Sequence, residues 1–181
     1  NVLMISVNNL RADALNASEM PSTYQFAIDN QNFTNHYSSS NDAFGAFGLF
    51  YGLPTSYASS IKAQGSSPVM LNVLQEQGYS FGLFSGNGFE DDLYPEVIFR
   101  GLELAPTLDG AQAHTEAQSL IAWNTWLTEQ ANTPWFSYIE VTTVDNFESE
   151  PASINNELSA SERFKQAYAV SYTHLRAHET Q

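Results

Sequence analysis

The sequence predicts an α/β domain in which helices cover both faces of a parallel or mostly parallel sheet. Strand and helix patterns alternate along the chain, which is typical of this class. The first strand pattern is an unbroken apolar run, as expected for a strand that is buried on both faces. With 181 residues, 43% of them hydrophobic, the chain is long enough to form one domain with a sizeable core.

Two strands and two helices are expected in the first third of the chain. Residues 1–7 form the apolar strand, and residues 21–30 have apolar side chains at helical spacing, opened by a proline that suits a first turn. Residues 32–37 are a short strand candidate. Residues 43–50 are expected to form a buried helix, which Asp42 caps and a following glycine ends.

The alternation continues in the rest of the chain. A helix is expected over residues 68–77, and a strand of aromatic residues and leucine over residues 79–84. Residues 97–104 form a weaker strand pattern, and residues 135–144 form the clearest late strand, because they are rich in aromatic and β-branched residues. The first strand and the two aromatic-rich strands are expected to be neighbours in one sheet. The clearest helix spans residues 111–130 and is expected to pack on that sheet through Leu120, Ile121, Trp123, Trp126 and Leu127.

Residues 1–169 are expected to form one partial domain, followed by a tail at residues 170–181. The tail has no apolar periodicity with which to build a core, so we expect it to be non-native or disordered. It holds His174 and His178 at a helical spacing, but the glutamate that follows the first histidine in a zincin motif is absent. The chain starts inside a strand and without a methionine, so we expect it to be part of a longer protein.

Charge and composition exclude several classes of function. Acidic side chains outnumber basic ones by 20 to 6, a formal charge of −14, so binding to nucleic acid over a broad surface is not expected. No stretch of the sequence approaches the roughly 18 apolar residues that a membrane span needs. The lack of cysteine excludes disulfides and thiolate metal ligands.

Asn8 is the first candidate site residue, because it directly follows the first strand. Ligands collect just beyond the carboxyl ends of parallel strands. The side-chain oxygen of Asn8 can complete the coordination shell of a hard divalent cation, but it adds no charge. The alternative is that the first core strand simply ends in a polar turn.

Ser40 is the second candidate, at the end of a run of three serines before the predicted helix at residues 43–50. A hydroxyl in this place lies beside unpaired N–H groups and the positive end of the helix dipole. That arrangement suits phosphate or sulfate and, if a metal is present, a developing alkoxide. The alternative is a solvated turn of serines and Asn41, with Asp42 as the helix cap.

Four segments together resemble the sulfatase/alkaline-phosphatase superfamily, and within it the YejM/PbgA group. They are residues 1–13, 32–39, 47–54 and 74–85. The string Phe-Gly-Leu-Phe-Tyr-Gly-Leu-Pro at residues 47–54 is the most specific of the four. The resemblance extends over residues 1–169.

The resemblance implies an α/β/α sandwich with a mostly parallel sheet that is incomplete at its C-terminal end. It also implies a domain at the periplasmic face of a Gram-negative inner membrane, with a membrane anchor outside this chain. The group controls lipopolysaccharide supply and outer-membrane lipid balance through contact with lipid and with envelope regulatory proteins. We therefore expect a regulatory role in outer-membrane lipid homeostasis.

The resemblance also implies which residues form a site. In active relatives a carboxylate after the first strand binds a divalent metal, and a Cys, Ser or Thr nucleophile opens the next helix. The matching residues are Asn8 as a metal ligand and Ser40 as nucleophile and metal ligand, with magnesium or manganese bound weakly or not at all. The remaining ligands, an Asp-His pair, are expected downstream of residue 170.

Whether the protein is an enzyme stays open at this point. The alternative to a regulatory role is a divalent-metal-dependent phospho- or sulfo-ester hydrolase with a serine nucleophile, similar to phosphoethanolamine or phosphoglycerol transferases. The Cys/Ser-x-Pro-x-Arg signature of sulfatases is absent from the sequence, which argues against sulfate esters as the substrate.

Overall fold

The computed structural model describes residues 1–86, 88–102 and 116–142. Two compact units are present, the first formed by residues 1–6 and 37–140, the second by residues 7–36 and the chain from 141 onward. We describe each unit by itself. The predicted tail, with His174 and His178, lies outside the described residues.

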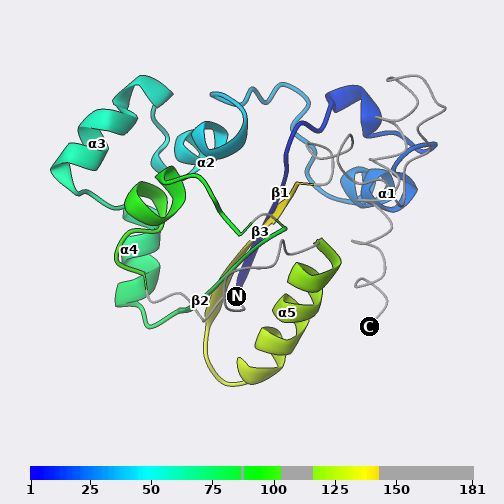
Figure 1. Ribbon diagram of the computed structural model, residues 1–181. Coiled ribbons are helices and arrows are strands. Elements are labelled where there is room, and N and C mark those ends of the chain that lie inside the picture. The colour runs from blue at the N-terminus through cyan, green and yellow to red at the C-terminus, as the bar shows by residue number, and fades with distance from the viewer. Residues whose placement is uncertain (87, 103–115, 143–181) are drawn as a thin grey trace. The chain divides into compact units, whose positions relative to one another are not determined.

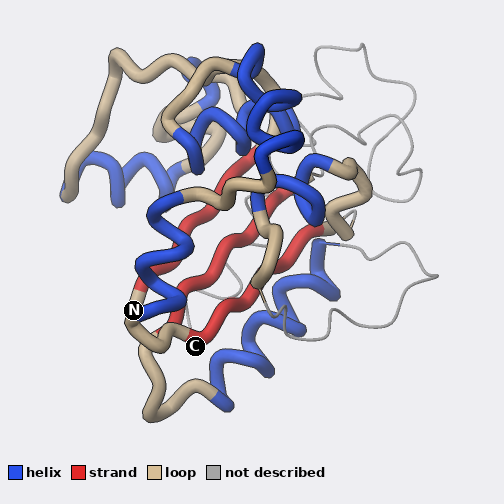
Figure 2. Tube along the Cα trace, turned by 90° about the vertical axis from the view of Figure 1, so that its left-hand side faces the viewer, coloured by secondary structure: helices blue, strands red, loops and turns tan. Residues whose placement is uncertain are grey.

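The first unit is built on a three-stranded sheet of β1 (Val2–Val7), β2 (Ser80–Ser85) and β3 (Trp135–Val141). The strands lie in the order β1-β3-β2 (Figure 1). Figure 2 shows them side by side in one sheet. β2 and β3 run parallel, with Ser85 opposite Glu140 at their carboxyl ends. The predicted α/β class and the predicted set of neighbouring strands are therefore confirmed.

β3 is the central strand, and its residues are buried on both faces. Its side chains alternate, so that Phe136 and Tyr138 face one side of the sheet while Ser137 faces the other. Ser137 donates a hydrogen bond from its hydroxyl to the carbonyl of Gly82 on β2, at 3.0 Å. This bond satisfies a buried polar side chain inside an otherwise apolar layer.

β1 was expected to be buried on both faces, and this expectation is wrong for the described part of the chain. Val2, Leu3 and Ile5 are exposed. The reason is positional, because β1 stands at one end of the strand order and has a described partner strand on one side only.

One face of the sheet is covered by the helices from α2 to α4 and by the turn η3 that follows β2 (Figure 1). The elements are α2 (Asp42–Tyr51), a 3₁₀ turn η2 (Thr55–Tyr57), α3 (Ala58–Gln64), α4 (Val69–Glu76) and a π-helical turn η3 (Tyr94–Ile98). α2 buries Ala43, Ala46, Phe47 and Phe50, a spacing that places all four on one helix face.

Aromatic rings form most of this core. The ring of Phe50 makes edge contacts with the rings of Phe99, Tyr138 and Phe136, with ring centroids 5.4, 5.3 and 6.3 Å away. Phe47 is completely buried and stacks on Tyr51 with a centroid distance of 4.6 Å. Offset and edge-to-face pairs of this kind stabilise a core beyond the burial of their area.

α5 (Glu116–Glu129) covers the opposite face, mainly over β2 (Figure 1). A methyl group at Gly82 would approach the rings of Phe84 and Trp126 to 2.9 Å, so the glycine is what allows the helix to pack this closely. Leu120 and Trp126 are buried, as predicted, but Ile121 is 59% exposed. A helix turns by about 100° per residue, which rotates Ile121 away from the face of Leu120.

Two predicted strands are wrong. Residues 32–37 have no strand structure and are exposed, because polar side chains on both sides of the chain leave no face to bury. Of residues 97–104, the described part forms the end of η3 and a turn. The π-helical turn buries the side chains of Tyr94, Val97 and Ile98, so these residues reach the core without forming a strand. η2 and α3 were not predicted.

The second unit contains η1 (Ala12–Ala14) and α1 (Pro21–Asp29). α1 matches the predicted helix, with its proline in the first turn. Ala14 is buried against Val7 and Leu10. None of the helices in the described part of the chain has the length and apolar character needed to cross a membrane.

Candidate functional site

Asn8 lies directly after β1, in the second unit. Its backbone N–H donates a hydrogen bond to the carbonyl of Val141 at 3.0 Å, and the residue is almost fully buried. The next residue, Asn9, has a left-handed backbone with φ of 55°. Asparagine tolerates this conformation better than most residues, and such positions gather at functional sites.

Ser40 lies two residues before α2, in the first unit. Its hydroxyl donates to the side-chain oxygen of Asn41 at 3.4 Å, and its carbonyl accepts a hydrogen bond from the Ser38 hydroxyl. The expected cap is wrong, because Asn41 is the residue that precedes α2 and Asp42 is the first helical residue, with a left-handed φ of 48°. If the superfamily site is retained, the sequence leads us to expect Asn8 and Ser40 to face each other across the carboxyl edge of the sheet. The two residues belong to different units, so this stays a prediction.

The serine loop before α2 packs against two glycines of that helix. A methyl group at Gly45 would lie 2.7 Å from the carbonyl oxygen of Ser40, and one at Gly48 would lie 1.8 Å from the Ser39 hydroxyl oxygen. Contacts this short are not found in folded proteins, so only glycine permits the loop to lie here. Gly45 therefore positions the backbone of Ser40.

We expect Gly45→Ala to move Ser40 and to lower the free energy of unfolding by about 1–3 kcal/mol, since the new methyl group meets backbone that must shift. Gly48→Ala is expected to act in the same direction, because its new methyl group would lie 2.7 Å from the Cβ of Ser39, which rotation of the serine side chain cannot move. Urea unfolding of both variants measures the losses. Unchanged or increased stability of either variant would contradict the expectation.

Sequence reasoning missed a buried carboxylate in the first unit, near the carboxyl end of β3. Glu140 is 2% exposed, although it stands on the central strand among aromatic residues. One of its carboxylate oxygens accepts a hydrogen bond from the Ser85 hydroxyl on β2 at 2.9 Å, and the other accepts one from the Tyr94 hydroxyl on η3. The signal that could have found it is the alternation of β3, which puts Glu140 on the same face as Phe136 and Tyr138.

Burial and charge suppress ionisation of the two tyrosines in this region. Burial raises the pKa of Tyr94 far above its usual value, and the negative charges of Glu140 and Asp42 act in the same direction. Burial likewise raises the pKa of Tyr138, and Glu140 adds to the effect. Both phenols therefore stay protonated in the folded protein, and the Tyr94 hydroxyl acts as a donor toward Glu140.

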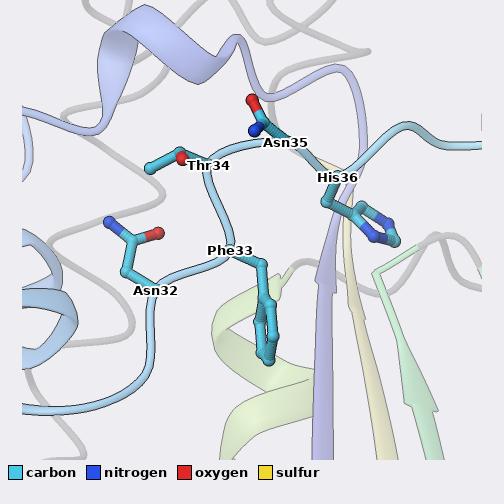
Figure 3. A pocket seen from close by; sticks show the side chains of 5 residues that line it. All are labelled: Asn32, Phe33, Thr34, Asn35 and His36. Atoms are coloured by element: carbon cyan, nitrogen blue, oxygen red, sulfur yellow. The ribbon is translucent and has the colours of Figure 1, made fainter.

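The second unit has an open hollow of about 360 Å³, lined by Asn32, Phe33, Thr34, Asn35 and His36 (Figure 3). These five residues follow one another along a single exposed segment. His36 is the only ionisable side chain among them, so the hollow offers little charge with which to hold a ligand.

The donor set proposed for a metal consists of Asn8 and Ser40, which contribute two neutral oxygens. Magnesium and manganese prefer carboxylates, so these two residues do not fit a divalent cation by themselves. Within the described ranges, no three His, Asp or Glu side chains come together. The two oxygens of Glu140 accept hydrogen bonds from hydroxyl groups, so the carboxylate already has partners inside the fold.

Comparison with known proteins reveals several relatives. Over 144 residues the chain is 34% identical to an uncharacterized protein of Haemophilus influenzae, a match that covers 78% of this chain and 24% of that protein. Over 170 residues it is 33% identical to the inner membrane protein YejM of Salmonella typhimurium, covering 88% of this chain and 28% of YejM. No family model matches the sequence. The chain thus spans about a quarter of the length of these relatives.

One solved structure supports the fold. It is the crystal structure of a protein in the alkaline phosphatase superfamily from Vibrio parahaemolyticus. The structures match with a TM-score of 0.68 over 97% of this chain and 48% of the other, at 14% sequence identity. The similarity establishes the α/β fold of the superfamily for this chain.

Proposed function

This chain is a homologue of part of the inner membrane protein YejM and has the fold of the alkaline phosphatase superfamily, and we propose that it is a sulfatase-like domain with a regulatory rather than a hydrolytic role. We place it at the periplasmic face of a Gram-negative inner membrane. There it contributes to lipopolysaccharide and outer-membrane lipid homeostasis, through lipid and partner proteins that contact the full-length protein.

The observation that carries the regulatory role is the identity of the residue after β1. Asn8 stands where an active relative needs a carboxylate, and it supplies no negative charge to a divalent ion. The buried carboxylate that is present, Glu140, accepts hydrogen bonds from Tyr94 and Ser85. The carboxylate of Glu140 therefore has hydrogen-bond partners that stabilise the fold, and this favours a structural role over metal binding.

A metal-dependent ester hydrolase that uses Ser40 is the second candidate function. It is favoured by the position of Ser40 just before α2, together with the left-handed backbone of Asn9 and Asp42 beside the two candidate residues. Backbone strain of this kind is often retained at functional sites.

Turnover of phosphate and sulfate esters by the full-length protein distinguishes the two functions. We expect poor turnover with magnesium or manganese, and tighter metal binding after Asn8→Asp if the other ligands are present, because the new carboxylate adds a charge. Ser40→Ala is expected to leave the low activity unchanged. Robust metal-dependent turnover that Ser40→Ala abolishes would establish the hydrolase instead.

Lipid contact is expected to reside outside the described part of the chain. Lys62 and Arg100 both interact with Glu96. Lys62 forms an ion pair with the Glu96 carboxylate and lowers the pKa of that group. The guanidinium of Arg100 donates a hydrogen bond to the backbone carbonyl of Glu96. The remaining surface is acidic, with a formal charge of −14 for the whole chain, so it repels anionic lipid.

Sedimentation of the purified chain with liposomes, in the presence of chelator, checks this expectation. We expect no preference for anionic over neutral lipid, because the chain has a formal charge of −14 and like charges repel. Binding to anionic liposomes that weakens with added salt would show that a basic patch exists on this chain.

A further inference from the structure

The strongest unexplained feature of the first unit is the segment between β2 and the end of η3, residues 88–98. Phe89 has a left-handed backbone with φ of 57°, a costly conformation for an aromatic residue. Tyr94 then opens a π-helical turn, a rare element that is found often at functional sites. A segment that combines both features needs strong anchors to keep its conformation.

Tyr94 is the polar anchor of this segment. Its hydroxyl donates to the buried carboxylate of Glu140 on β3, while its ring packs on Phe89 and Phe99 with centroid distances of 4.8 and 5.9 Å. Ser85, at the end of β2, donates to the other carboxylate oxygen at 2.9 Å. Glu140 thus joins the end of the central strand to the segment and to the neighbouring strand.

The same anchor lies close to the start of α2. Ala43 and Tyr94 belong to one buried cluster, and α2 packs directly on η3. The negative charge of Asp42 acts on the Tyr94 hydroxyl as well and, like that of Glu140, raises the pKa of this group. The backbone of Asp42 is itself left-handed, so a strained position lies at the start of α2 as well as on the segment, at Phe89.

We propose that the Tyr94–Glu140 hydrogen bond is a latch that couples the strained segment at residues 88–98 to the start of α2, where Ser40 and Asp42 lie. While the bond is formed, both strained positions are held. When it opens, the segment and the first turn of α2 relax together. The proposal rests on the regulatory function above, because regulation needs a part of the protein with two states, and the latch is such a part, either closed or open.

Hydrogen exchange of the whole protein tests the latch without any assay of function. Tyr94→Phe keeps the ring and removes only the hydroxyl. We expect it to speed exchange at residues 88–98 and 42–46 by about 10- to 100-fold, as expected for the loss of a buried hydrogen bond to a charged group. Glu140→Gln should give the same pattern with a smaller change. Tyr57→Phe, at a half-exposed tyrosine, is the matched control and should change neither region.

Asp42→Asn tests the coupling from the other end. Asparagine tolerates a left-handed backbone, so the variant removes the charge and keeps the conformation. Because the negative charges of Asp42 and Glu140 both act on the Tyr94 hydroxyl, we expect removal of one charge to favour burial of the other and to slow exchange at residues 88–98. No change at this segment would overturn the coupling.

Two results with Tyr94→Phe would overturn the latch. The first is unchanged exchange in both regions, which would mean that packing alone holds the segment. The second is an equal acceleration throughout the first unit, β3 included, because the bond would then contribute to global stability only. Neither result bears on the turnover of esters, so the latch and the proposed function can fail independently.

Discussion

Phe47→Ala is expected to lower the free energy of unfolding by about 3–5 kcal/mol. Phe47 is fully buried in α2, where it stacks on Tyr51 within the aromatic core. Truncation removes the transfer free energy of the ring and leaves a cavity that the surrounding rings cannot fill without leaving their edge contacts. Urea unfolding followed by circular dichroism measures the loss.

Phe44→Ala provides the control for this prediction, because it makes the same chemical change on the same helix at a side chain that is 43% exposed. We expect a loss of about 1 kcal/mol or less, as is usual for residues outside the core. If both variants lost the same amount, the buried face of α2 would be wrongly assigned, because the change to alanine raises helix propensity and cannot itself cause the loss.

Glu140→Ala is expected to lower the free energy of unfolding by about 2–5 kcal/mol, although a charged residue is replaced by a small apolar one. The variant removes the buried acceptor that the Tyr94 and Ser85 hydroxyls share, and the loss of a buried partner costs about 1–3 kcal/mol for each group. Urea unfolding near neutral pH measures the loss. Glu76→Ala, at an exposed carboxylate on α4, should change stability by only about 0.5 kcal/mol.

A combined variant separates the hydrogen bonds from the charge. Replacing all three partners by apolar groups, as Glu140→Leu with Tyr94→Phe and Ser85→Ala, removes the unsatisfied hydroxyls together with the carboxylate. We expect it to be more stable than Glu140→Ala, since an apolar set of similar shape can be nearly neutral. A further loss of stability would mean that the negative charge itself stabilises the fold.

Local sequence patterns pointed to Asn8 and Ser40 but not to Glu140. Asn8 and Ser40 became candidates because local patterns predict the strand that Asn8 follows and the helix that Ser40 precedes, and both remain predictions. Glu140 was not found, because a single glutamate in a strand pattern looks like a solvent-facing residue until the opposite face of the sheet is known. Its partners Ser85 and Tyr94 lie 55 and 46 residues away along the chain, so no local pattern contains them.

The same reasoning applies to the elements that were predicted wrongly. The segment at residues 32–37 has the length and aromatic content of a strand, but a strand also needs a partner, and the structure provides none there among the described residues. At residues 97–98, Val97 and Ile98 favour a strand, yet they form the end of the π-helical turn η3, which is held by the bond from Tyr94 to Glu140 and by the burial of both side chains. Tertiary context decides both places, through the absence of a described partner strand at the first and through packing at the second.

The sequence by itself determined the α/β class, the three strands, the helices α1, α2, α4 and α5, and the family to which the chain is related. These features follow from apolar periodicity and from turn residues, which act between residues close together in the chain. Tertiary structure alone decided the edge position of β1, the left-handed start of α2 and the buried partners of Glu140. Those features depend on which distant segments pair, because burial and hydrogen bonding are settled only when the strands and helices come together.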